Sequence, residues 1–127
     1  MRLLNGINIF KALGDESRVR ILHLIYKNDE MCISDLELIL DYTQTKTSRH
    51  LIYLKNCGLL KSKKIDQWVY YYINAPYLSI IKTLLNYFDD DEMIRKDLDE
   101  YRTLYSNNEL AIRRLHNKQK KYKMPEL

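Results

Sequence analysis

The residues best suited to chemistry in this chain lie in one stretch, from Thr43 to Leu60. Read as a helix, the stretch places hydroxyl, amide and basic side chains on or near one side: Thr45, Lys46, Arg49 and Asn56. Such groups hydrogen-bond base edges and phosphates in a DNA major groove, and a helix N-terminus adds affinity for phosphate. The pattern therefore predicts a recognition helix, although a solvated helix face would have the same composition.

The ends and the buried side of this helix can also be predicted. Thr43 is suited to the N-cap and Gly58 to the position just after the C-cap. Thr47, Leu51 and Leu54 recur at helical spacing opposite the polar face. The helix is therefore expected to bury one face in a core and to leave the polar face open.

The elements before this stretch must position it. Residues 3–13 and 15–26 carry apolar residues at helical spacing, with Gly14 between them. Residues 31–33 are suited to a short extended piece. Ser34 and Glu37 form a capping-box pattern, which predicts a third helix through Leu40. The turn at residues 41–43 is short enough to join two crossing helices, so the chain predicts a helix-turn-helix.

A β-hairpin is predicted directly after the recognition helix. Residues 60–65 and 68–73 are β-prone and are separated by Asp66 and Gln67. The tip of this hairpin is expected to be basic, and its second strand is aromatic. A basic hairpin in this place has the properties of a wing, which contacts the DNA backbone or the neighbouring minor groove.

The remainder of the chain predicts further helices. Residues 77–88 form a wide apolar stripe, which indicates a partner helix from a second subunit, although the stripe could instead close its own core. Residues 93–105 and 110–115 support two more helices, followed by a basic tail with Lys118, Lys120, Lys121 and Lys123, which is expected to be frayed. The predicted fold is mostly α with a small β-hairpin: a winged helix-turn-helix domain over residues 1–90 and a C-terminal helical extension and basic tail over 91–127.

Bulk properties agree with a small DNA-binding protein. The 127 residues suffice for one domain, and three Gly with two Pro favour helices over a many-turned β fold. The net charge is +4. Residues 41–64 hold six basic residues and one acidic residue, whereas residues 89–100 hold seven acidic and two basic residues. Positive charge is thus concentrated around the predicted recognition helix, where phosphate would bind.

Cysteine content and hydropathy suggest a cytoplasmic location. The chain has two cysteines, no signal-peptide pattern at its start and no apolar run of membrane-spanning length. Three scattered histidines and two cysteines supply no nucleophile, base and orienting group at a recognisable spacing, so we do not expect an enzyme. We also expect no cofactor and no association with a membrane.

Several motifs in order resemble the ArsR/SmtB family of winged-helix repressors. Residues 15–22 fit the pattern D-x-[TS]-R-x-x-I-L, and residues 30–36, 43–51, 54–60 and 67–71 fit successive parts of the family pattern. The resemblance covers about Phe10 to Asn74. It implies a homodimer that binds a double-stranded DNA operator with an inverted repeat and loses affinity for it when an effector binds.

The resemblance also assigns residues. Positions matching the DNA-reading segment and the wing are Gln44, Thr45, Lys46, Ser48, Arg49, His50, Lys63, Lys64 and Gln67. His50 could equally be a structural hydrogen-bonding residue at the edge of the buried face. A dimer through the first and fifth helices would use Leu4, Ile7, Leu78, Ile81 and Leu85.

The effector site is where this chain departs from the family. The arsenic-responsive branch has three cysteines where this chain has Cys32, Ser34 and Glu37, and soft ions require several thiolates. Residues 77–88 lack the histidine and carboxylate ligands of the zinc-responsive branch. We therefore expect no metal site. Two alternatives remain: a thiol-redox-responsive repressor that uses Cys32 and Cys57, and a winged-helix protein-interaction module without DNA binding.

Overall fold

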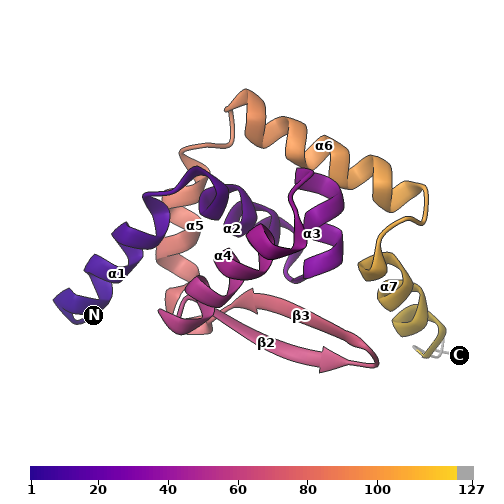
Figure 1. Cartoon of the computed structure of the whole chain (residues 1–127), viewed down its shortest axis with the longest axis horizontal. Coiled ribbons are helices and arrows are strands. Elements are labelled where there is room, and N and C mark those ends of the chain that lie inside the picture. Colours follow the sequence, from indigo (N-terminus) through magenta and orange to yellow (C-terminus); the bar gives the residue numbers. More distant parts are fainter. Residues whose placement is uncertain (123–127) are drawn as a thin grey trace, which may run out of the picture.

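The computed structural model describes residues 1–122, which fold into helices with a three-stranded antiparallel sheet whose β2–β3 hairpin lies along one edge of the molecule (Figure 1). The elements are α1 (Leu3–Leu13), α2 (Glu16–Asn28), β1 (Met31–Cys32), α3 (Ile33–Leu40), α4 (Gln44–Asn56), β2 (Leu60–Ile65), β3 (Trp68–Ile73), the 3₁₀ turn η1 (Ala75–Tyr77), α5 (Leu78–Asn86), α6 (Glu92–Ser106) and α7 (Ala111–Tyr122). The predicted winged helix-turn-helix with extra C-terminal helices is confirmed.

The helix-turn-helix consists of α3, the turn at residues 41–43 and α4. Asp41 adopts the left-handed conformation (φ 56°) that ends α3. The Thr43 hydroxyl caps α4 by accepting a hydrogen bond from the N–H of Lys46 at 3.2 Å. Gly58 has φ +87° directly after the C-cap, a conformation that disfavours side chains with a Cβ. Both predicted ends of the recognition helix are confirmed.

The predicted capping box at the start of α3 is wrong. The helix begins at Ile33 with Cys32 as its N-cap, so Ser34 lies inside the first turn. The reason is the pairing of β1 with β3, which holds Met31 and Cys32 extended opposite Tyr71 and Tyr70. The Ser34 hydroxyl instead lies 3.3 Å from the Cys32 sulfur.

The wing is the hairpin of β2 and β3, whose strands have the predicted bounds. Ile65 pairs with Trp68, and Asp66 adopts φ 56° in the two-residue turn. β3 lies between β2 and β1, so the wing is anchored to the residue just before α3. The hairpin therefore has a fixed position relative to the helix-turn-helix.

The core is built around α2, whose Ile21, Leu22, Leu24 and Ile25 are fully buried. α5 packs against α2, which corrects part of the predicted dimer interface. Ile81 and Leu85 are 0% exposed in the single chain, so they are core residues and offer no surface to a second subunit. Of the predicted interface residues, Leu4, Ile7 and Leu78 are exposed.

The C-terminal extension packs on the helix-turn-helix. α6 crosses over α2 and α3, and α7 descends beside α3 toward the wing (Figure 1). Leu110, Ala111, Ile112 and Leu115 belong to the same apolar cluster as the core of residues 1–90. The tail was predicted to fray after Leu115, but α7 continues to Tyr122; Lys123 lies outside the described residues.

Two buried carboxylates fasten the extension. Asp97 of α6 accepts two hydrogen bonds from the guanidinium of Arg20 on α2, both at 2.9 Å. Asp35 of α3 accepts the N–H groups of Ala111 and Ile112 at 2.8 and 2.9 Å, at the start of α7. Burial raises the pKa of Asp35, while the two N–H groups act in the opposite direction. One carboxylate in the helix-turn-helix thus satisfies the orphan donors of a helix some 76 residues later.

We predict that Asp35→Ala lowers the free energy of unfolding by about 1–3 kcal/mol, because two buried N–H groups lose a charged acceptor. Urea denaturation followed by circular dichroism measures the change. Asp99→Ala is the matched control, because Asp99 is an exposed carboxylate on α6, and its effect should stay within about 0.5 kcal/mol. Equal stability of Asp35→Ala and wild type would contradict the assigned role.

Candidate nucleic-acid interface

The open face of α4 gathers the predicted DNA-reading side chains around one hollow. Gln44, Thr45, Ser48, Arg49 and Ile52 line a concavity of about 440 Å³. Gln44, Thr45 and Arg49 are exposed, and Ser48 is half-buried. The four polar residues offer an amide, two hydroxyls and a guanidinium at the N-terminal half of the helix, which are groups that pair with base edges.

Ile52 was missed by the sequence reasoning. Its side chain is 52% exposed on the same face, one helical turn after Ser48 and Arg49. An exposed apolar side chain among polar ones suits contact with a thymine methyl group. The signal was present in the sequence, because Ile52 occupies an outward position of the helix at i+3 from Arg49.

Lys46 is held at the start of the recognition helix. Its ammonium lies 3.9 Å from the centre of the Tyr42 ring, and the Tyr42 hydroxyl accepts a hydrogen bond from Arg20 at 3.0 Å. The charge of Lys46 is thereby fixed at the turn of the helix-turn-helix. A phosphate near this helix end would meet both that charge and the free N–H groups of the first turn.

His50 does not lie on the open face, which corrects its assignment to the DNA-reading set. Its side chain is only 7% exposed. Burial lowers its pKa, as do the charges of Arg18, Arg49 and Lys46, while Asp15 acts in the opposite direction. His50 therefore has a structural role, which was the second interpretation given to it from the sequence.

The two wing lysines differ in surroundings. Lys63 forms an ion pair with Glu30 and lies 5.6 Å from the centre of the Tyr72 ring. Lys64 is exposed on the opposite side of β2, as strand alternation requires, and Gln67 is exposed in the turn. Lys64 is therefore the better placed of the two for an unpaired phosphate contact.

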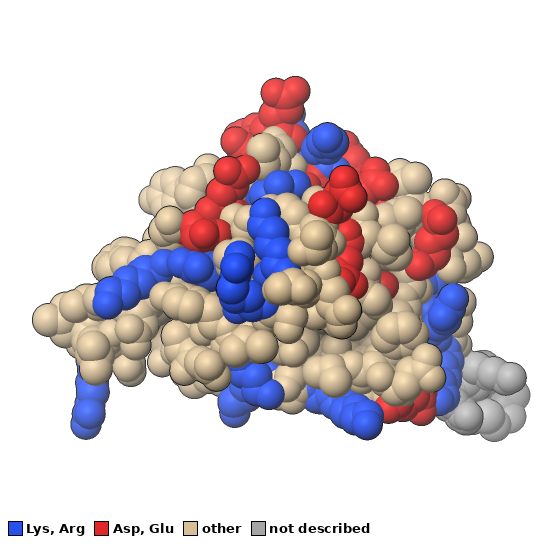
Figure 2. Space-filling view, viewed as in Figure 1, with Lys and Arg blue, Asp and Glu red and all other residues tan. Residues whose placement is uncertain are grey.

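Charge is segregated over the surface. Figure 2 shows Lys and Arg over the middle of the face, where α4 lies in Figure 1, along the lower edge occupied by the wing, and at the right beside α7. Asp and Glu gather along the top, over α6. The acidic residues predicted around 89–100 are thus held at the side of the fold away from the wing.

Neither cysteine has the surroundings of a reactive thiol. Cys32 is buried, and burial together with the charge of Asp35 raises the pKa of its thiol to about 11. Cys57 is half-buried and donates its S–H to the carbonyl of Leu54 at 3.3 Å. Among residues 1–122, no group of three or more His, Cys, Asp or Glu side chains is arranged to hold a metal ion.

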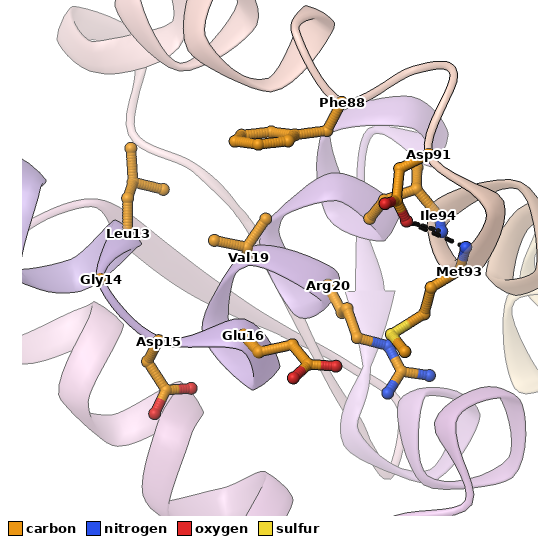
Figure 3. A pocket seen from close by; sticks show the side chains of 10 residues that line it. All are labelled: Leu13, Gly14, Asp15, Glu16, Val19, Arg20, Phe88, Asp91, Met93 and Ile94. Carbon is orange, nitrogen blue, oxygen red and sulfur yellow. Dashed lines mark hydrogen bonds between the residues drawn. The ribbon is translucent and has the colours of Figure 1, made fainter.

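A cavity of about 490 Å³ lies between the end of α1, the first half of α2 and residues 88–94, which lead into α6. Figure 3 shows Leu13, Val19 and Phe88 along one side and Glu16 with Arg20 on another, with Met93 and Ile94 from the start of α6 completing the lining. None of these residues belongs to the open face of α4. A small molecule bound here would therefore contact α2 and α6 without touching the recognition helix.

Comparison with known proteins agrees with this geometry. The sequence model described as "Bacterial regulatory protein, arsR family" matches residues 15–62, which run from the cap of α2 into β2. The arsenical resistance operon repressor of Escherichia coli (strain K12) is 42% identical over 78 residues, which are 61% of this chain and 66% of that protein. The cadmium resistance transcriptional regulatory protein CadC of Listeria innocua serovar 6a is 37% identical over 82 residues, 64% of this chain and 69% of that protein.

The chain belongs to the ArsR family. The family is one of DNA-binding transcriptional regulators, and the resemblance inferred from the sequence motifs is confirmed. The solved structure of HlyU from Vibrio cholerae N16961 superposes with a TM-score of 0.61 at 26% identity, covering 67% of this chain and 92% of that one. At least a third of this ArsR-family chain thus lies outside each match, since the matched shares of the three similar proteins are 61%, 64% and 67%. No helix within residues 1–122 is long and apolar enough to cross a membrane.

We predict that iodoacetamide labels Cys57 well before Cys32 in the folded protein at pH 7.5. A pKa of about 11, above the ordinary value of 9.0, lowers the thiolate fraction of Cys32 by about a hundredfold, and burial blocks access as well. Mass spectrometry of native and urea-unfolded samples measures labelling at each site, with Cys57→Ser as the control. Rapid native labelling of Cys32 would contradict the prediction and revive the thiol-redox alternative.

Proposed function

We propose that this ArsR-family protein is a homodimeric repressor that binds a double-stranded DNA operator in a sequence-specific manner. The observation that carries the proposal is the convergence of Gln44, Thr45, Ser48 and Arg49 on one open face of α4. The helix that carries these residues is held in place by its cap at Thr43 and by the core residues on its opposite side. Rigid support favours base reading, which requires side chains to meet base edges in a defined register.

The proposed interface divides the work between helix and wing. Arg49 is exposed on the recognition face and can pair bidentately with a guanine edge. Lys64 and Gln67 on the wing meet phosphates, with Lys63 contributing less because Glu30 already balances its charge. All the DNA-contacting residues expected from the sequence, apart from His50, are therefore part of the proposed interface.

The proposed dimer uses α1, whose apolar side chains remain uncovered in the single chain. Leu4 is 68% exposed, and Leu3, Ile7 and Phe10 lie on the same projecting helix (Figure 1). A helix with so much exposed apolar surface is not stable alone in water, so a second subunit is the natural cover. Leu78 at the start of α5 is also exposed. Two-fold symmetry then implies an operator with an inverted repeat.

The cysteine positions that the arsenic-responsive branch of the family uses are only partly present in this chain. The relatives named above are an arsenical resistance operon repressor and a cadmium resistance transcriptional regulatory protein. In the family resemblance, the arsenic-responsive cysteine positions correspond here to Cys32, Ser34 and Glu37. Cys32 is buried against Ser34, and its thiol is protonated at neutral pH. We therefore propose that this chain does not sense arsenite through that site, since a soft ion needs several thiolates.

The alternative function, a protein-interaction module without DNA binding, makes a different use of the same fold. It would leave the basic residues of α4 and the wing without a ligand. Selection of fragments from a random DNA pool separates the two, because a repressor enriches one sequence and an interaction module enriches none. The same selection supplies the operator for the tests below.

We predict that Arg49→Ala reduces the preference for the selected operator over scrambled DNA by about 1–3 kcal/mol, because a bidentate pair with guanine is lost. Lys64→Ala should weaken binding to both DNAs equally and reduce the dependence of affinity on salt. Fluorescence anisotropy over a salt series measures both. Equal losses of affinity on the two DNAs for Arg49→Ala would indicate that Arg49 contacts DNA phosphates and not base edges.

We predict that Leu4→Asp combined with Ile7→Asp gives a folded monomer with weak operator affinity, because the charges replace exposed apolar contacts between subunits. Sedimentation velocity measures the association state and circular dichroism the fold. Leu38→Asp, an exposed apolar position on α3, is the matched control and should remain dimeric. Sedimentation of the unmodified chain as a monomer at micromolar concentration would count against the dimer.

A further inference from the structure

The least explained surface of the molecule is α7, which is strongly basic and lies at the tip of the wing. Residues 111–122 contain five basic residues and no acidic residue: Arg113, Arg114, Lys118, Lys120 and Lys121. The match to the family model ends at residue 62, well before this helix begins. The apolar side of α7 packs in the core, whereas the fold does not explain why its other side is basic.

The helix is held in place by its N-terminal half. Asp35 accepts the first two N–H groups of α7, and Ile112 and Leu115 are buried beside α3 and β1. The Tyr105 hydroxyl lies 2.8 Å from Nδ1 of His116, which joins α7 to α6. The basic side therefore has a fixed direction relative to the helix-turn-helix.

That direction is toward the wing turn. Arg114 and Lys118, one turn apart on α7, lie with Ile65, Asp66 and Trp68 around a small cavity of about 70 Å³. The Lys118 ammonium lies 2.8 Å from the carboxylate of Asp66. Arg114 and Lys120 are exposed. Figure 1 shows α7 beside the tip of the β2–β3 hairpin, with the recognition helix at the other end of the wing.

The contact with Asp66 has an electrostatic consequence for the wing. Asp66 is suited to the left-handed turn position, but its carboxylate places a negative charge at the point of the wing that approaches phosphates. Lys118 balances that charge. Lys64 on the wing and Arg114 and Lys120 on α7 are exposed, so the two elements that meet at the wing tip both carry positive charge at the surface.

We propose that α7 is a third DNA-contacting element, which binds the phosphate backbone of the duplex just beyond the wing. The inference rests on the proposed operator binding and extends it: each protomer would cover more backbone than α4 and the wing reach. The contact carries no base specificity, because Lys and Arg side chains on an exposed helix meet phosphates as point charges. It lengthens the footprint outward from each half-site and steepens the salt dependence of affinity.

The test uses the full chain with Arg114→Gln and Lys120→Gln together. The matched control is Lys96→Gln with Arg102→Gln, which removes the same charge from exposed positions of α6. Two duplexes carry the operator selected by the wild-type protein from a random pool. The long duplex extends about one helical turn, roughly 10 base pairs, beyond each half-site, and the short duplex is trimmed at the half-site edges.

The proposal expects the α7 variant to lose about tenfold in affinity on the long duplex and nothing on the short one. The slope of log affinity against log salt on the long duplex should fall by about 2 to 4, since each phosphate contact contributes about 0.9 and a dimer has two copies of α7. Hydroxyl-radical protection should disappear only at the outer backbone positions. The α6 control should match wild type throughout.

Three outcomes would contradict the proposal. An α7 variant that binds the long duplex as wild type does, with an unchanged footprint, overturns the proposal while leaving operator binding intact. Loss on both duplexes alike also overturns it, because the effect would then be one of general charge. If the wild-type chain selects no DNA at all, the proposed function itself fails, and the inference fails with it.

A second set of variants isolates Lys118. Lys118→Gln should weaken binding to the long duplex, because the Asp66 carboxylate is then unbalanced at the wing tip. Adding Asp66→Asn, which keeps a residue suited to the left-handed turn, should restore most of the affinity. Wild-type affinity for Lys118→Gln would remove the charge-balancing role assigned to this pair.

Discussion

The burial of α2 is the constraint on which the rest of the structure depends. This helix contacts α1, α4, α5, α6 and the sheet, and its two arginines fasten the helices around it. Arg18 donates to the last carbonyls of α1, at Lys11 and Ala12, and lies 4.1 Å from the centre of the Tyr53 ring on α4. Arg20 donates two hydrogen bonds to the Asp97 carboxylate of α6 and one to the hydroxyl of Tyr42, which lies beside the recognition helix. A recognition helix needs such a rigid base, because an error of about an ångström at a base edge removes the hydrogen bond.

The division between buried and exposed residues explains how one short helix can both fold and read DNA. Thr47, His50, Leu51 and Leu54 face inward, and Thr47 donates its hydroxyl proton to the carbonyl of Thr43, which closes the first turn. The opposite side of α4 is thereby free to carry polar groups that contribute little to stability. His50 shows why sequence position alone is insufficient: it follows Arg49 directly, yet the helical rotation of about 100° per residue turns it toward the core.

The extension changes the character of the protein relative to the part that its relatives share. Residues 89–100, which include the first part of α6, hold seven of the 17 acidic residues at the side away from the wing, and α7 carries basic residues to the wing tip. Both helices are fixed by buried carboxylates, Asp97 and Asp35, which would be costly without their partners. The arrangement also creates the cavity between α2 and the start of α6, so its lining includes residues of both the core helix and the extension.

The sequence by itself determined the order and type of the elements, because each depends on local chemistry: the cap at Thr43, the turn conformation of Gly58, the two-residue turn of the wing and the helical spacing of apolar residues. It also determined the polar face of α4, since a helix of known ends has a known outward side. Only the tertiary structure decided that Ile81 and Leu85 of α5 belong to the core of the single chain, because their spacing is the same whether they meet α2 or a second subunit. It likewise decided that α3 begins at Ile33 and that Asp35 caps α7, because both follow from contacts between residues far apart in the chain, which no local pattern records.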